Sequence, residues 1–134
     1  MSLKLPAVEN KYLKKYIITV YRIKAMPPDK MKKTAAQLKK QFIPDENIYK
    51  ALIEKNLKMS LSMAALYRGA GVDFAALITA ANKGLIKAVK EWSKSEEQDF
   101  ESFIIWKTEQ SVISRIIRSR KKEIKKVKNN KKGV

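Results

Sequence analysis

The sequence predicts an all-α fold, a compact bundle of about five helices. Only four glycines and four prolines occur in 134 residues, and apolar residues recur at helical rather than strand spacing through almost every segment. A hydrophobic content of 45% is enough to fill one modest core. We therefore expect one main helical domain (residues 45–120), preceded by a helical segment (1–44) and followed by a basic, disordered tail (121–134).

The first two expected helices are separated by adjacent prolines. The first covers approximately residues 9–25, and its apolar face consists of Leu13, Tyr16, Ile17 and Val20. Pro27 and Pro28 end it, because proline has no amide hydrogen and clashes with the preceding turn. Asp29 can begin the second helix, which Pro44 ends, and its apolar residues are Met31, Ala35, Leu38 and Phe42.

Acidic residues mark the starts of the next two helices. Asp45 is suited to cap a third, longer helix, which Gly69 and Gly71 close. Its expected buried line is Ile48, Leu52, Asn56, Met59, Met63 and Tyr67. Asp73 can cap a fourth helix with the clearest amphipathic pattern in the chain, formed by Phe74, Leu77, Ile78, Ala81, Leu85, Ala88 and Trp92.

A polar loop and a basic segment complete the chain. Residues 93–98 read as a loop, after which Asp99 or Ser102 can start a fifth helix that runs to about Arg120. Residues 115–134 contain ten Lys or Arg and one Glu, a net charge of +9. Such a charged end is usually solvated, so we expect disorder from about Asn129 onward.

The charge of the whole chain points to a polyanionic partner. Lys and Arg number 30 against 13 acidic residues, for a formal net charge of +17. Nucleic acid is the leading candidate, because each cation that neutralises a phosphate releases a condensed counterion. The alternative is a Lys-rich protein whose charge reflects an A+T-rich genome.

The composition argues against most enzymes. The chain has no cysteine and no histidine, which removes thiolate nucleophiles, thiolate metal sites and the usual general base. No catalytic arrangement, metal site or cofactor is expected. The only acidic cluster, Glu96, Glu97, Asp99 and Glu101, reads as solvated surface. No stretch is apolar enough to suggest a membrane span or a signal peptide, so we expect a cytoplasmic protein.

Aromatic residues beside cations form the most informative segment. Phe100, Phe103 and Trp106 recur three apart and are followed by Lys107. Unpaired bases can stack on aromatic rings, at about 1–3 kcal/mol per base, while cations hold the adjoining phosphates. Alternatively the three aromatics are core residues on one helix face, and spacing alone favours that alternative.

Several motifs between residues 52 and 117 occur in the order and spacing of a known family. They are LIEKNLKM (52–59), YRGAGVDF (67–74), LI (77–78) and NKGLIKAV (82–89), followed after a loop by Phe100, Phe103, Trp106 and Gln110. In these motifs the chain resembles the central region of the bacterial sigma-70 family of transcription initiation factors. Residues 56–117 align with that region without a gap, and residues 1–44 resemble the preceding segment less specifically.

The resemblance implies a domain similar to sigma region 2 that captures and melts the minus-ten promoter element through its non-template strand. Phe103 would stack on a flipped adenine and Phe100 would pack near the strand. Trp106 would form half of the wedge at the fork, and Gln110 would face the last base pair. Lys107 would lie beside them, and the duplex backbone would be followed by Arg115, Arg118, Arg120, Lys121 and Lys122.

The resemblance also implies docking on the clamp helices of core RNA polymerase. The candidate contacts are Leu77, Asn82, Leu85 and Ile86. Two sets of positions depart from the family. Its acidic and amide contacts fall on Ala76, Thr79 and Ala80, which cannot supply the same hydrogen bonds and charges. Lys107 replaces a second tryptophan and Gln98 an aromatic, so melting could be weaker or differently specific.

Further partners and other functions stay open. After Arg120 no helices follow that could bind the polymerase flap or a minus-35 element. Either the chain is a fragment of a longer factor or a partner supplies that role, and an anti-sigma regulator is another candidate partner. The chain could instead bind nucleic acid without sequence preference, as an accessory protein. Binding to anionic membranes is disfavoured, because residues 121–132 contain only Ile124 and Val127 as apolar residues.

Overall fold

The computed structural model describes residues 10–40 and 45–132, and these form helices without any strand. The helices are α1 (Lys11–Tyr21), α2 (Pro28–Lys40), α3 (Glu46–Lys55), α4 (Leu57–Leu66), α5 (Phe74–Trp92) and α6 (Phe100–Lys132). The predicted all-α class is confirmed. The expected helix boundaries at Glu9 and Pro44, and the expected core residue Phe42, lie outside the described residues.

Side-chain caps start three of the helices. Asn10 accepts hydrogen bonds from the amides of Tyr12 and Leu13 at α1, and Asp45 accepts one from the amide of Asn47 at α3. Asp99 accepts from both the amide and the hydroxyl of Ser102 at the start of α6. These bonds satisfy amides that have no partner within the helix. Asp73 precedes α5 as expected but makes no capping hydrogen bond through its side chain.

The long third helix expected over residues 45–67 is two helices, and Asn56 separates them. The Asn56 side chain donates to the Leu52 carbonyl at 2.7 Å, while its own backbone amide donates to Ile53. Asn side chains compete in this way for the carbonyl that a continuing helix would use. The described residues therefore form six helices, where the sequence predicts about five.

Two glycines turn the chain between α4 and α5. Gly69 and Gly71 have φ angles of +93° and +84°, in the left-handed region where side chains are strained. The expected closing role of both glycines is confirmed. Proline has a different role from the expected one at α2, where Pro28 is the first helical residue rather than the stop before it, because its fixed φ suits the first turn.

The core consists of two clusters, with α5 and α6 contributing to both. One cluster contains residues of α1, α4, α5 and α6, among them Val20, Leu77 and Val112. The other joins α2 and α3 to the second half of α5 and the start of α6, around Trp92. The indole nitrogen of Trp92 donates to the Ala35 carbonyl at 2.9 Å. The N-terminal helices therefore share the core of the main helical domain.

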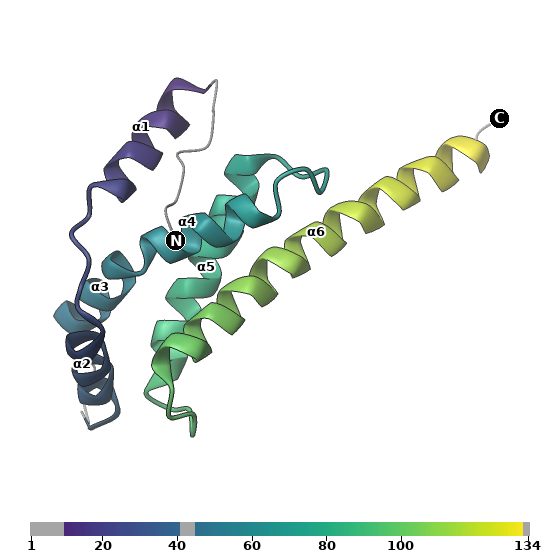
Figure 1. Ribbon diagram of the computed structural model, residues 1–134. Coiled ribbons are helices and arrows are strands. Elements are labelled where there is room, and N and C mark those ends of the chain that lie inside the picture. The colour runs from purple at the N-terminus through teal and green to yellow at the C-terminus, as the bar shows by residue number, and fades with distance from the viewer. Residues whose placement is uncertain (1–9, 41–44, 133–134) are drawn as a thin grey trace.

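Helix α6 is longer than expected. It is 33 residues long and continues to Lys132, so the prediction that it ends near Arg120 is wrong. No glycine or proline interrupts the sequence before Gly133, and Lys, Arg and Glu are good helix formers. Figure 1 shows the C-terminal half of α6 extending away from the other helices.

Candidate nucleic-acid interface

The aromatic residues at the start of α6 have two different surroundings. Phe100 and Phe103 are buried, with ring centroids 5.2 and 5.5 Å from that of Trp92. The Trp106 side chain is 54% exposed. Of the three aromatics predicted to contact bases, only Trp106 presents an open ring, and the alternative that Phe100 and Phe103 are core residues agrees with their burial.

Lys107 joins the aromatic segment to the neighbouring helix. Its ammonium nitrogen lies 5.1 Å from the Trp106 ring centroid and 5.7 Å from that of Phe103. It also forms an ion pair with Glu91 of α5 at 3.2 Å. A cation within about 6 Å of a ring face is attracted to it. Lys107 is thus held between the aromatic rings and α5.

A cationic groove lies where α5 and α6 cross. We call it the α5–α6 groove. It has a volume of about 320 Å³ and is lined by Lys83, Gly84, Lys87, Lys107, Gln110, Ser111, Ser114 and Arg118. The structure thereby brings together three predicted DNA contacts, Lys107, Gln110 and Arg118. No carboxylate lines the groove, so a phosphate group is the ligand that its charge favours.

Glycine explains why the two helices approach so closely at the groove. A Cβ atom on Gly84 would lie 2.5 Å from the Cβ of Ser111 and 3.1 Å from the Lys107 carbonyl. The Ser111 hydroxyl donates to the Ala80 carbonyl at 2.6 Å across the same crossing. Only a residue without a side chain fits at position 84 with α6 in this place.

Lys83 and Lys87 are candidate contacts that the sequence prediction missed. They lie four residues apart on α5, and both line the α5–α6 groove. Lys87 also lies 3.9 Å from Glu91. Positions four apart share a helix face, and this spacing is the sequence signal that could have identified them.

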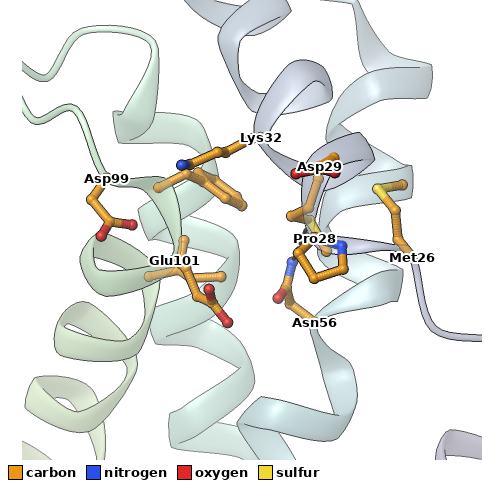
Figure 2. A pocket seen from close by; sticks show the side chains of 10 residues that line it. Met26, Pro28, Asp29, Lys32, Asn56, Asp99 and Glu101 are labelled. Carbon is orange, nitrogen blue, oxygen red and sulfur yellow. Dashed lines mark hydrogen bonds between the residues drawn. The ribbon is translucent and has the colours of Figure 1, made fainter.

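A second, acidic cavity lies beside Phe100. It has a volume of about 250 Å³, and its polar lining includes Asp29, Lys32, Asn56, Asp99 and Glu101. Figure 2 shows Asp99 and Glu101, at the start of α6, facing Pro28 and Asp29, at the start of α2. The hydrogen bonds from Ser102 hold the pKa of the Asp99 carboxyl below its usual value. Three carboxylates against one ammonium disfavour a phosphate here, whereas carboxylates accept hydrogen bonds from the amino groups of bases.

The remaining predicted cations follow α6 without forming one surface. Arg115 is half-buried, and the others, Arg118, Arg120, Lys121 and Lys122, are exposed. Arg115, Arg118 and Lys122 share a helix face by their spacing, whereas Arg120 and Lys121 lie on other faces. A duplex that contacts the first three would not contact all five at once.

Two of the predicted polymerase contacts are fully buried. Leu77 and Leu85 are 0% exposed, so the prediction that they contact a partner is wrong in this structure. Their positions on the apolar face of α5 bury them against neighbouring helices. Asn82 accepts a hydrogen bond from Ser60 and donates one to Tyr16, which ties its side chain to the core.

Ile86 is the remaining predicted polymerase contact, and it is 37% exposed. It lies at a broad hollow between α3 and α5 of about 630 Å³, which is also lined by Glu46, Tyr49, Lys50, Ile53 and Lys90. In the described part of the chain, no group of acidic side chains is arranged to hold a metal ion, and no helix is long and apolar enough to cross a membrane.

The comparisons with known proteins agree on one group of relatives. No family model matches the chain. The RNA polymerase sigma factor SigA of a Bacillus species is 35% identical over 68 residues, which are 51% of this chain and 18% of that protein. SigA of Clostridium acetobutylicum is 29% identical over 97 residues, 72% of this chain and 25% of that protein.

A third curated relative belongs to the same group. The RNA polymerase sigma factor RpoD of Helicobacter pylori is 27% identical over 100 residues, 75% of this chain and 15% of that protein. The matched part is therefore a quarter or less of the length of each of these relatives. The chain is related by sequence to the RNA polymerase sigma factors of the sigma-70 family, and its all-α fold agrees with this relationship.

Proposed function

We propose that this chain is a sigma-like module of transcription initiation that binds one strand of opened promoter DNA. The observation that carries the proposal is that an open aromatic ring and a cationic groove meet on α6. Lys107 lies against the Trp106 ring and also lines the α5–α6 groove. A base stacked on Trp106 would therefore have its phosphate within reach of the groove cations.

In this proposal the two hollows beside α6 have different roles. The α5–α6 groove holds phosphates through Lys83, Lys87 and Arg118, at positions lined only by cations and neutral groups. The acidic cavity beside Phe100 receives an extruded base, whose amino group can donate to Asp99 or Glu101. Phe100 and Phe103 support the surface by packing on Trp92 rather than by stacking on bases. Binding energy from these contacts offsets the cost of unstacking the duplex.

The first test measures strand binding by fluorescence anisotropy. A pool of single strands is selected on the protein, and the enriched strand is compared with a scrambled strand of the same composition. We expect the enriched strand to bind more tightly, and Trp106→Ala to lose about 1–3 kcal/mol of binding free energy. Because Trp106 is half exposed, the variant should keep its thermal unfolding temperature.

A charge-matched pair of variants tests the α5–α6 groove. Lys83→Ala/Lys87→Ala should lower the slope of log K against log salt by about 1.4, or about 0.7 for each single-strand phosphate contact. Lys14→Ala/Lys15→Ala removes the same charge from exposed positions of α1 and should change the slope less. Equal affinity for enriched and scrambled strands, with equal effects of the two double variants, would point instead to non-specific binding by an accessory protein.

Docking on core RNA polymerase is the second part of the proposal, and we assign it to the hollow around Ile86. An apolar side chain with an adjacent opening can anchor a partner helix. Ile86→Asp should abolish co-elution with core polymerase at moderate salt. Ile105→Asp is the matched control, because Ile105 on α6 is 38% exposed against 37% for Ile86. If Ile86→Asp still co-elutes with core polymerase, the docking surface does not include the hollow around Ile86.

A further inference from the structure

The projecting half of α6 carries apolar side chains that are exposed in the part of the chain that the structure describes. They are Ile117, Ile124 and Val127, with Arg120 between them. The half-buried Ile113, in the packed part of α6, begins the same line, and we call these five residues the α6 stripe. Ile117, Ile124 and Val127 are 47%, 56% and 54% exposed. Successive members lie four, three, four and three residues apart, the spacing of the a and d positions of a coiled coil. The stripe therefore resembles the apolar line that one helix of a coiled coil presents to its partner, over about two heptads.

The α6 stripe continues the line by which α6 packs on the bundle. The buried residues Ile104, Thr108, Val112 and Ile116 recur every four residues, and the same step leads to Arg120 and Ile124. Residues at steps of four shift gradually around the helix, because a helical turn contains 3.6 residues rather than four. The line of residues that faces the core near Ile104 therefore faces solvent near Ile124. With a rise of 1.5 Å per residue, the stripe is about 21 Å long.

One flank of the α6 stripe is cationic. Lys121, Lys125 and Lys128 lie along one side and are exposed. The opposite flank carries no cation and consists of Ile116, Glu123 and Asn130. Like charges at steps of three and four destabilise an isolated helix. A partner with carboxylates along the edge that faces Lys121, Lys125 and Lys128 would remove this repulsion and cover the apolar residues at the same time.

From this arrangement we infer that the α6 stripe docks an amphipathic helix of another protein, with apolar a and d positions and an acidic flank that faces Lys121, Lys125 and Lys128. The contact lies outside the α5–α6 groove and is independent of strand binding. A second copy of this chain fits poorly, because each copy brings a net charge of +9 over residues 115–134. Duplex phosphates offer no apolar surface, and membrane-surface helices carry a wider apolar face than this narrow seam.

The test uses a synthetic helical peptide of about three heptads, with Leu at a and d and Glu at e and g. A scrambled peptide of identical composition has the same charge but no seam. We expect the full chain to bind the heptad peptide at least about tenfold more tightly than the scrambled one. Ile117→Ala/Ile124→Ala should remove that difference, because it deletes apolar area from the seam while alanine keeps the helix.

Two controls separate the stripe from general effects. Ile105→Ala removes the same type of side chain from α6 at a position off the stripe and should leave the preference unchanged. Circular dichroism should show equal helix content in all variants. Equal binding of both peptides, or a preference that survives Ile117→Ala/Ile124→Ala, would overturn the inference.

Two other occupants are tested with the same variants. Concentration-dependent dimerisation of the chain that Ile117→Ala/Ile124→Ala abolishes would overturn the inference in favour of a second copy. Flotation with phosphatidylserine vesicles that the same variant abolishes would overturn it in favour of a membrane surface. We expect neither, and strand binding by Ile117→Ala/Ile124→Ala should remain as in the parent chain.

Discussion

Residues 100–116 of α6 pack on the bundle, whereas residues 117–132 of the same helix extend into solvent (Figure 1). The first part buries six side chains, among them Phe100, Ile104 and Val112. In the second part every residue from 120 to 130 is exposed. Both parts are helical, so helix formation does not distinguish them. The difference is that tertiary packing supports the first part, while local propensity alone supports the second.

The largest predicted effect is on the free energy of unfolding, and it compares a side chain packed against the first part of α6 with one in the projecting part. Trp92→Ala should lower the free energy of unfolding by about 3–5 kcal/mol, because it removes a buried ring and leaves a cavity. Trp92 is almost fully buried between Phe100 and Phe103. Ile124→Ala should change it by less than about 0.5 kcal/mol. Urea denaturation followed by circular dichroism measures both, and a comparable loss in Ile124→Ala would mean that the projecting part packs against something.

An intermediate effect is expected at the crossing of α5 and α6. Gly84→Ala should destabilise the fold by about 1–3 kcal/mol through overpacking, although alanine is the better helix former. The added Cβ would meet Ser111 at 2.5 Å. Combining it with Ser111→Gly should show coupling in a double-mutant cycle. Additive effects would mean that the helices separate without cost, and that the crossing is looser than the contact distances indicate.

The smallest predicted effect is a pH dependence of stability. It arises at a contact between the end of α4 and the packed part of α6. The Tyr67 hydroxyl donates to Glu109 at 3.2 Å, and partial burial followed by the charge and hydrogen bond of Glu109 raises the pKa of Tyr67 above its usual value. A raised folded-state pKa means that the contribution to stability is complete below about pH 10 and is lost as pH rises through the folded-state pKa. Tyr67→Phe should therefore lose less stability between pH 9.5 and 11 than the parent chain, as measured by thermal unfolding. Identical slopes would show that the Tyr67 contact is not maintained in solution.

Local signals predicted the helices well and their ends less well. The capping roles of Asp45 and Asp99 and the turn at Gly69 and Gly71 follow from residue type. The break at Asn56 does not, because an apolar line at helical spacing crosses it without interruption. The break is visible only in the contacts of Asn56, whose side-chain amide donates to Leu52 and whose backbone amide donates to Ile53. Dense charge after Arg120 is typical of a solvated helix end, so the predicted end of α6 falls well before the observed one at Lys132.

The candidate site shows the same division. Aromatic and basic residue types identified the start of α6, but burial separated Trp106 from Phe100 and Phe103. Lys83 and Lys87 join Lys107 only because Gly84 lets α6 cross α5 closely. Leu77 and Leu85 matched a docking motif and proved to be core residues. A motif shows which residue types occur together in the sequence. It does not show whether a side chain is buried or exposed, because that depends on neighbours that are distant in sequence.

The sequence by itself determined the helical class, the excess of positive charge and the absence of cysteine and histidine, since these depend on composition and on local periodicity. The tertiary structure alone decided which aromatic ring is open, which lysines share a groove and which apolar residues of α6 are exposed. Burial is a property of contacts between segments far apart in the chain, and a single helix pattern contains no information about what lies opposite it.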